Sequence, residues 1–173
     1  MSTPSEPDGR ARIRDIVADL LADWPGPAST EVVPGLWQGG TDDDWPHGIP
    51  LLPDGRFVFD VVVTLFEDAP PVPEDVEEFR WHINDADLLD EDIPHLRRIA
   101  EAAHERWTEG SSVLVRCQAG INRSGLMTAL IIMQDGITAK AAIQAVREAR
   151  GPMALSNPSF EYWLLCFAGP PSD

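Results

Sequence analysis

The stretch Val113–Met133, "VLVRCQAGINRSGLMTALIIM", decides the fold. Its first four residues, VLVR, are typical of a buried strand. Residues 126–133 are apolar around nearly the whole helical circumference, which is typical of a central, buried helix. Between the two lies a short loop that begins with Cys117. A strand, a loop and a helix in this order place the loop at the carboxyl edge of a parallel sheet, where α/β folds bind ligands.

The segments around this stretch alternate between strand and helix patterns. Strands are predicted for Glu31–Gly40 (a short strand pair ending in a glycine turn), Phe57–Phe66 and Glu78–Ile83. Helices are predicted for residues 93–107, 138–150 and 158–168, the last with Asn157 as its N-cap. We therefore expect an α/β fold: a central, twisted, mostly parallel sheet of four to five strands with helices on both faces.

The length of 173 residues favours one domain with a sizeable core. Residues 1–9 are polar and predict a disordered tail. Residues 10–169 are expected to form the domain, beginning with a helix over 10–24 whose apolar residues recur at helical spacing. Residues 170–173 would form a C-terminal tail.

Composition excludes several classes of function. The formal net charge of −16 argues against binding to nucleic acid or anionic membranes, which requires clustered Lys and Arg. The N-terminus lacks a signal-peptide core, and no apolar run could span a bilayer, so we expect a cytoplasmic protein. Two cysteines form no disulfide framework, and Cys166 is expected in the core. The four histidines lack the spacing of metal ligands, so we expect neither a metal nor another cofactor.

The loop after Cys117 has the features of an anion site. It carries no acidic side chain, its N–H groups can converge as a nest, and the following helix directs its positive end at the same place. Arg123 can offer two parallel donors to two phosphoryl oxygens. The predicted phosphate-binding loop is Gln118, Ala119, Gly120, Ile121, Asn122 and Arg123.

A sulfur at the base of such a loop should be a thiolate, suited to attack phosphorus and form a phosphocysteine intermediate. The alternative is a structural cysteine buried at a strand end. The joint presence of Gly120, Arg123, Ser124 and Gly125 in this layout disfavours that alternative.

"VLVRCQAGINRSG" resembles the signature Cys-x5-Arg-Ser/Thr loop of the cysteine-based phosphatases, and the chain order resembles their dual-specificity branch. "VVPGLWQGG" resembles the opening strand and glycine turn of that branch, "INDAD" its acid loop, and "VREARGPMALSNPSF" its closing segment. The resemblance covers roughly residues 31–167. It implies a metal-independent enzyme with Cys117 as nucleophile and Arg123 as phosphate clamp and transition-state stabiliser.

The resemblance also implies two supporting roles. Ser124 would donate a hydrogen bond to the sulfur and help the thiolate leave, or would merely cap the helix. Asn157 would brace the loop, although helix capping explains it equally well. One departure is clear, because the family usually has His before the cysteine and this chain has Arg116. On an alternating strand Arg116 points away from the side of Cys117, where it adds positive potential or pairs with a buried acid.

A positioned carboxylic acid can protonate the leaving oxygen. The family carries an Asp in a loop before the cysteine, and Asp85, 32 residues before Cys117, occupies that place directly after "WHIN". Asp87 is the second choice and Asp90 the third. The remaining alternative is that this acidic loop is only a solvated surface and helix start.

We therefore expect a phosphatase that acts on phosphomonoesters, chiefly protein phosphotyrosine, with phosphoserine and phosphothreonine as further substrates. Its partners would be a phosphorylated protein or small phosphomonoester, with a phosphate ion at the site and no membrane or nucleic acid. One alternative is an RNA 5′-phosphatase or another non-protein phosphoryl substrate, because "GINRSG" also resembles the RNA 5′-triphosphatases of this superfamily. The other is a weakly catalytic phosphate-binding module.

Overall fold

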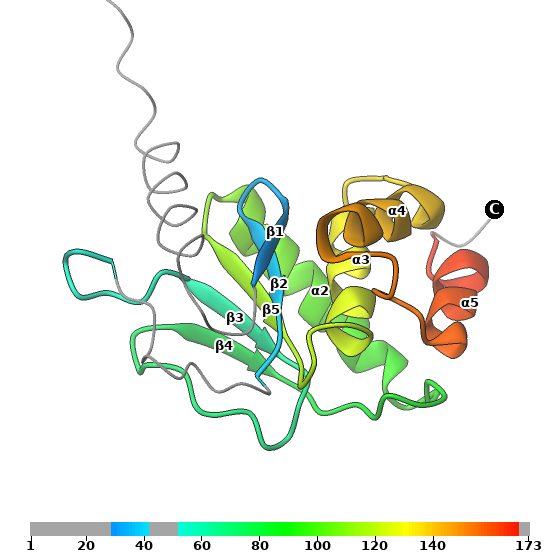
Figure 1. Cartoon of the computed structure of the whole chain (residues 1–173), viewed down its shortest axis with the longest axis horizontal. Helices are drawn as coiled ribbons and strands as arrows, with labels where there is room; N and C mark the ends of the chain where they lie inside the picture. The colour runs from blue at the N-terminus through cyan, green and yellow to red at the C-terminus, as the bar shows by residue number, and fades with distance from the viewer. Residues whose placement is uncertain (1–28, 42–51, 170–173) are drawn as a thin grey trace, which may run out of the picture.

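The computed structural model describes residues 29–41 and 52–169. The predicted tails at 1–9 and 170–173 and the predicted helix at 10–24 lie outside these residues. The described strands are β1 (Thr30–Val33), β2 (Leu36–Gly39), β3 (Val61–Thr64), β4 (Glu77–Arg80) and β5 (Val113–Arg116). They form one sheet in the order β1-β2-β5-β3-β4, in which β1 is antiparallel to β2 and the other pairs are parallel (Figure 1). The expected mostly parallel sheet is confirmed, whereas the four described helices pack on one face of it and not on both.

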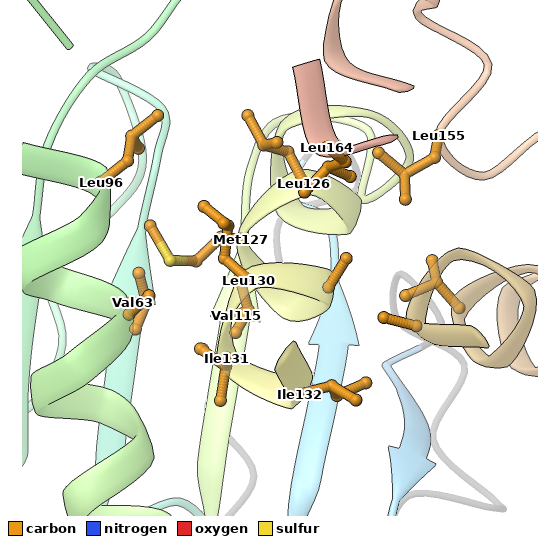
Figure 2. Packing of buried hydrophobic residues seen from close by; sticks show 14 of the residues in the cluster. Val63, Leu96, Val115, Leu126, Met127, Leu130, Ile131, Ile132, Leu155 and Leu164 are labelled. Atoms are coloured by element: carbon orange, nitrogen blue, oxygen red, sulfur yellow. The ribbon is translucent and has the colours of Figure 1, made fainter. Parts of the chain in front are cut away.

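The helices of the described residues are α2 (Ile93–Thr108), α3 (Arg123–Met133), α4 (Ala139–Arg150) and α5 (Pro158–Phe167). All four contribute to one apolar cluster on the face of the sheet that carries Val63 and Val115. Every residue of α3 from Arg123 to Ile132 is buried, as its apolar sequence predicts. In Figure 2, α3 lies at the centre of this cluster, with Met127 directed toward Val63 and toward Leu96 of α2.

The opposite face of the sheet carries a second cluster, the aromatic cluster, which is built around the rings of Trp37, Phe57 and Phe59. Trp37 and Phe57 both pack edge-on against Phe59, and Val62 and Leu114 join them from the sheet.

The strand predicted for Phe57–Phe66 is shorter in the structure, where β3 spans Val61–Thr64. The N–H groups of Asp60 and Val61 both donate to the carbonyl of Ser112, so the regular ladder begins only at Val61. No helix of the described residues is long and apolar enough to cross a membrane.

The prediction that Cys166 lies in the core is wrong, because its side chain is exposed. Phe160, Trp163 and Leu164 form the buried face of α5. With 3.6 residues per turn, position 166 lies about 120° around the helix from Phe160, the middle of this buried face. An apolar run alone could not show which side of this helix is covered.

The central position of α3 predicts a large cost for truncating its side chains. Leu130→Ala should lower the free energy of unfolding by about 2–5 kcal/mol, because Leu130 is 2% exposed and its removal leaves a cavity. The matched control is Ile137→Ala, which removes a side chain that is 41% exposed and should change stability by about 0.5 kcal/mol at most. Urea unfolding measures both, and equal losses would contradict the burial of α3.

Candidate active site

Cys117 follows β5 directly and lies at the bottom of the site. Its side chain is 2% exposed, and its Sγ lies 3.3 Å from the Oγ of Ser124, which is fully buried in the first turn of α3. The N-cap of α3 is Asn122, so the alternative that Ser124 caps this helix is wrong. A hydroxyl at this distance can donate to a cysteine thiolate.

The carbonyl groups of the loop turn outward, onto the surrounding framework. The bonds are Thr41 N to Gln118 O at 2.6 Å, Gln38 Nε2 and Arg150 Nη2 to Gly120 O at 3.1 and 3.2 Å, and Leu155 N to Ile121 O at 3.3 Å. Within the described ranges, the backbone N–H groups of residues 118–122 donate to no protein acceptor. Outward carbonyls and free N–H groups make the concave nest that binds an anion.

Two close backbone approaches hold the loop against the end of β2. Gly120 has a φ of +69°, and a Cβ at this position would lie 2.5 Å from the backbone carbon of Gly39. A Cβ on Gly40 would in turn lie 2.6 Å from the carbonyl oxygen of Gln118. Only glycine fits at either position, so the glycine turn after β2 is part of the site.

Arg123, the first residue of α3, reaches back across the loop and is 7% exposed. Its Nη1 donates to Ile83 O at 3.4 Å and its Nη2 to Gln118 Oε1 at 3.3 Å. Its Cζ lies 5.3 Å from the ring centroid of Phe66, within cation–π range. The Nε of Arg123 is buried and has no hydrogen-bond partner among the described residues. A buried donor of this kind calls for an acceptor, and a phosphoryl oxygen is a suitable one.

Arg150 adds positive charge behind the loop. Besides Gly120 it contacts Thr30 Oγ1 at 2.9 Å, so it joins α4, β1 and the loop. Partial burial lowers the pKa of Arg150 from its ordinary value, and the nearby Cys117 acts in the opposite direction. Arg150 therefore holds the carbonyl of Gly120 from the outside of the loop.

Asp85 is tied to the same loop by two amides. Its Oδ2 accepts from Asn122 Nδ2 at 3.0 Å and its Oδ1 from Asn157 Nδ2 at 2.9 Å. Asn122 also accepts from the backbone N–H of Asn157 at 3.1 Å, which closes a triangle. Asn157 Oδ1 accepts from Ser159 N at 3.0 Å, so Asn157 both caps α5 and contacts the loop.

The second-choice acid, Asp87, occupies the same neighbourhood. It lines a shallow, open pocket together with Asp85, Asn122 and Asn157. No described residue anchors its carboxylate to the phosphate-binding loop. Of these two carboxylates, the structure therefore joins that of Asp85 to the loop. Among residues 29–41 and 52–169, no three His, Cys, Asp or Glu side chains gather in a way that could hold a metal ion.

Comparison with known proteins assigns the chain to a family. Residues 55–168 match the family model described as dual specificity phosphatase, catalytic domain. The chain belongs to the dual specificity phosphatase family.

Similar members of this family come from mammals. Dual specificity protein phosphatase 15 of Mus musculus is 27% identical over 144 residues, and that of Rattus norvegicus 28%. Each alignment covers 80% of this chain but 57% of the relative, so the chain spans little more than half the length of these curated relatives. The crystal structure of human DUSP28 is 25% identical with a TM-score of 0.63, covering 81% of this chain and 91% of that one. The crystal structure of DUSP15 is also 25% identical, with a TM-score of 0.64 and coverage of 81% and 86%.

In this member of the family the structure brings the predicted site residues together: Ser124 lies beside Cys117, and Asp85 and Asn157 contact the loop through Asn122. Sequence reasoning missed Gln38 and Arg150 as partners of the loop carbonyl of Gly120. Arg150 lies in the segment that resembles the closing part of the family, which was the available signal. For Gln38 the sequence offered no signal beyond its position beside the glycine turn.

The close fit of the loop against β2 predicts that Gly120→Ala weakens anion binding. Gly136→Ala is the control, because Gly136 has a φ of +76° but a Cβ at that position would meet no atom within 4 Å. Both substitutions carry the left-handed backbone cost of about 1–2 kcal/mol, and only Gly120→Ala adds a clash with backbone. Tungstate binding measured by calorimetry should fall by about tenfold or more in Gly120→Ala alone. Unchanged binding in a folded Gly120→Ala protein would contradict the packing described.

Proposed function

We propose that this chain hydrolyses phosphomonoesters through a phosphocysteine intermediate on Cys117, with protein phosphotyrosine as the main substrate and phosphoserine and phosphothreonine as further substrates. The observation that carries the proposal is the loop itself. Its carbonyls are bound outward, its N–H groups meet no acceptor among the residues that the structure describes, and the Cys117 sulfur lies at its base beside a hydroxyl. Membership of the dual specificity phosphatase family supports the same reaction class.

In the first half of the reaction the phosphoryl group would occupy the nest. The free N–H groups of residues 118–122 and the Nε of Arg123 would bind its non-bridging oxygens, whose charge they also stabilise in the transition state. The Cys117 thiolate would attack phosphorus in line with the leaving oxygen. As the S–P bond forms and the P–O bond breaks, protonated Asp85 would pass its proton to the leaving oxygen.

In the second half a water molecule would hydrolyse the phosphocysteine. Asp85, now a carboxylate, would accept the proton of the attacking water while the S–P bond breaks and inorganic phosphate forms. The sulfur would depart as a thiolate, and Ser124 Oγ, 3.3 Å away, would donate a hydrogen bond to it. Each step uses only groups of the chain, the substrate and water.

The protein substrate class is supported by charge. A formal net charge of −16 repels a polyanionic nucleic acid, whereas a phosphorylated side chain on a neutral or basic segment is not excluded by it. The choice of protein phosphotyrosine over an RNA 5′-phosphate rests on this charge and on the resemblance to the dual-specificity branch.

The direct test is release of nitrophenol from an aryl phosphate in EDTA and reductant. The wild type should turn over, and Cys117→Ser should lose turnover because the hydroxyl is far less nucleophilic than the thiolate. Binding of tungstate by the inactive variant is the control for an intact loop. A wild type that binds tungstate without turnover would instead favour a phosphate-binding module. Turnover that survives in Cys117→Ser would exclude the cysteine mechanism.

The role of Asp85 predicts a dependence on the leaving group. Asp85→Asn should lower kcat by about 100-fold or more for an alkyl or phenyl phosphate, whose leaving oxygen needs a proton. The loss should be much smaller for nitrophenyl phosphate, whose leaving group is a weak base. Asp87→Asn is the matched variant and should change kcat for neither kind of substrate. The reverse pattern, with the leaving-group effect in Asp87→Asn, would reassign the acid.

A further inference from the structure

The residue before the nucleophile departs from the family, and its surroundings show a built network. Arg116 lies on the face of the sheet opposite Cys117 and is 3% exposed. Its Nε donates to Thr64 Oγ1 at 2.9 Å, and its Nη2 lies 3.3 Å from Glu78 Oε1 and 2.5 Å from the carbonyl of Pro70. Burial lowers the pKa of Arg116 from its ordinary value, and Glu78 opposes the effect.

Glu78 is shared by a second arginine. Arg80 Nη2 donates to Glu78 Oε1 at 2.9 Å, and the hydroxyl of Thr64 donates to the same oxygen at 2.6 Å. Burial by itself would raise the pKa of Glu78, but the hydrogen bonds from Thr64 and Arg80 outweigh it, so the pKa is lowered. We call Arg80, Arg116 and Glu78 the arginine–glutamate cluster.

The arginines of this cluster donate hydrogen bonds to the carbonyl groups of one loop, residues 66–70. Arg80 Nη1 donates to Glu67 O at 3.3 Å and to Ala69 O at 3.2 Å, and Arg116 binds Pro70 O. The loop begins with Phe66, and the guanidinium of Arg123 lies over the ring of this residue. The cluster is therefore linked to the phosphate clamp through a single aromatic ring.

A buried ion pair adds little net stability, because desolvation offsets most of the attraction between its charges. A role in geometry is the better account of this cluster. We propose that the arginine–glutamate cluster is a positioning device for Arg123: it fixes loop 66–70 so that the ring of Phe66 holds the guanidinium in its phosphate-binding orientation. Arg116 thus supports the site from behind the sheet. The proposal rests on the proposed function, since it concerns the group that would bind phosphate.

The test is a double-mutant cycle read out by the affinity for tungstate, measured by calorimetry on the full chain in EDTA. Phe66→Leu removes the ring face, and Glu78→Gln removes the charge that the two arginines share. Each should weaken binding by about threefold to tenfold, in line with a cation–π contact. The double variant should bind no more weakly than the weaker single variant, because Glu78 acts through Phe66.

Phe57→Leu is the control for a general loss of packing. Phe57 is 6% exposed and packs on Phe59 in the aromatic cluster, so its truncation should lower stability while leaving tungstate affinity unchanged. A purely structural role of Glu78 would give the same pattern as Phe57. If Glu78→Gln does not fold, Arg80→Gln replaces it in the cycle, because Arg80 is the more exposed partner.

Two results would overturn this proposal and leave the proposed function intact. One is a loss of tungstate affinity in the double variant that equals the product of the two single losses. The other is a folded Glu78→Gln protein that binds tungstate as tightly as the wild type. A wild type that binds no tungstate would overturn the anion site as well. A wild type that binds tungstate but releases no nitrophenol would overturn the proposed function and leave the cycle measurable.

Discussion

The site depends on one constraint, the outward orientation of the loop carbonyls after Cys117. A carbonyl turned inward would place negative charge where a phosphoryl oxygen would bind in the proposed reaction. The framework prevents this by giving Gln118, Gly120 and Ile121 donors on the outside. These donors come from two distant stretches of the chain, residues 38–41 and 150–155. The sheet and helices can be understood as the scaffold that delivers those donors to one place.

The sequence predicts the loop well because its information is local. Strand, cysteine, glycine, arginine and buried helix follow one another, so periodicity and spacing place them without knowledge of the rest of the chain. The donors to Gly120 could not be predicted in this way, since Gln38 is 82 residues away and Arg150 is 30. Asn157 shows both cases: its cap is local, but its bond to Asp85 spans 72 residues. Cys166 was misplaced because an apolar run does not reveal which of its residues the neighbouring elements cover.

The two faces of β5 carry side chains with different surroundings. Alternation along β5 sends Val115 and Cys117 toward the helices and Arg116 toward the opposite face. A large, always charged side chain can be accommodated there only because Thr64, Glu78 and a carbonyl satisfy its donors. Arg116, the residue before Cys117, therefore contacts β3, β4 and loop 66–70, and no hydrogen bond joins its side chain to the phosphate-binding loop among the described residues.

Three hydrogen bonds among Asp85, Asn122 and Asn157 join the loop that carries Asp85 to the phosphate-binding loop. A catalytic acid carried on a separate lid must travel to the substrate in every turnover, and the rate of that closure can limit kcat. Here the carboxylate is already beside the cradle before a substrate arrives. For the proposed reaction no closure of an acid-bearing lid would have to precede proton transfer, so solvent viscosity should not slow that step.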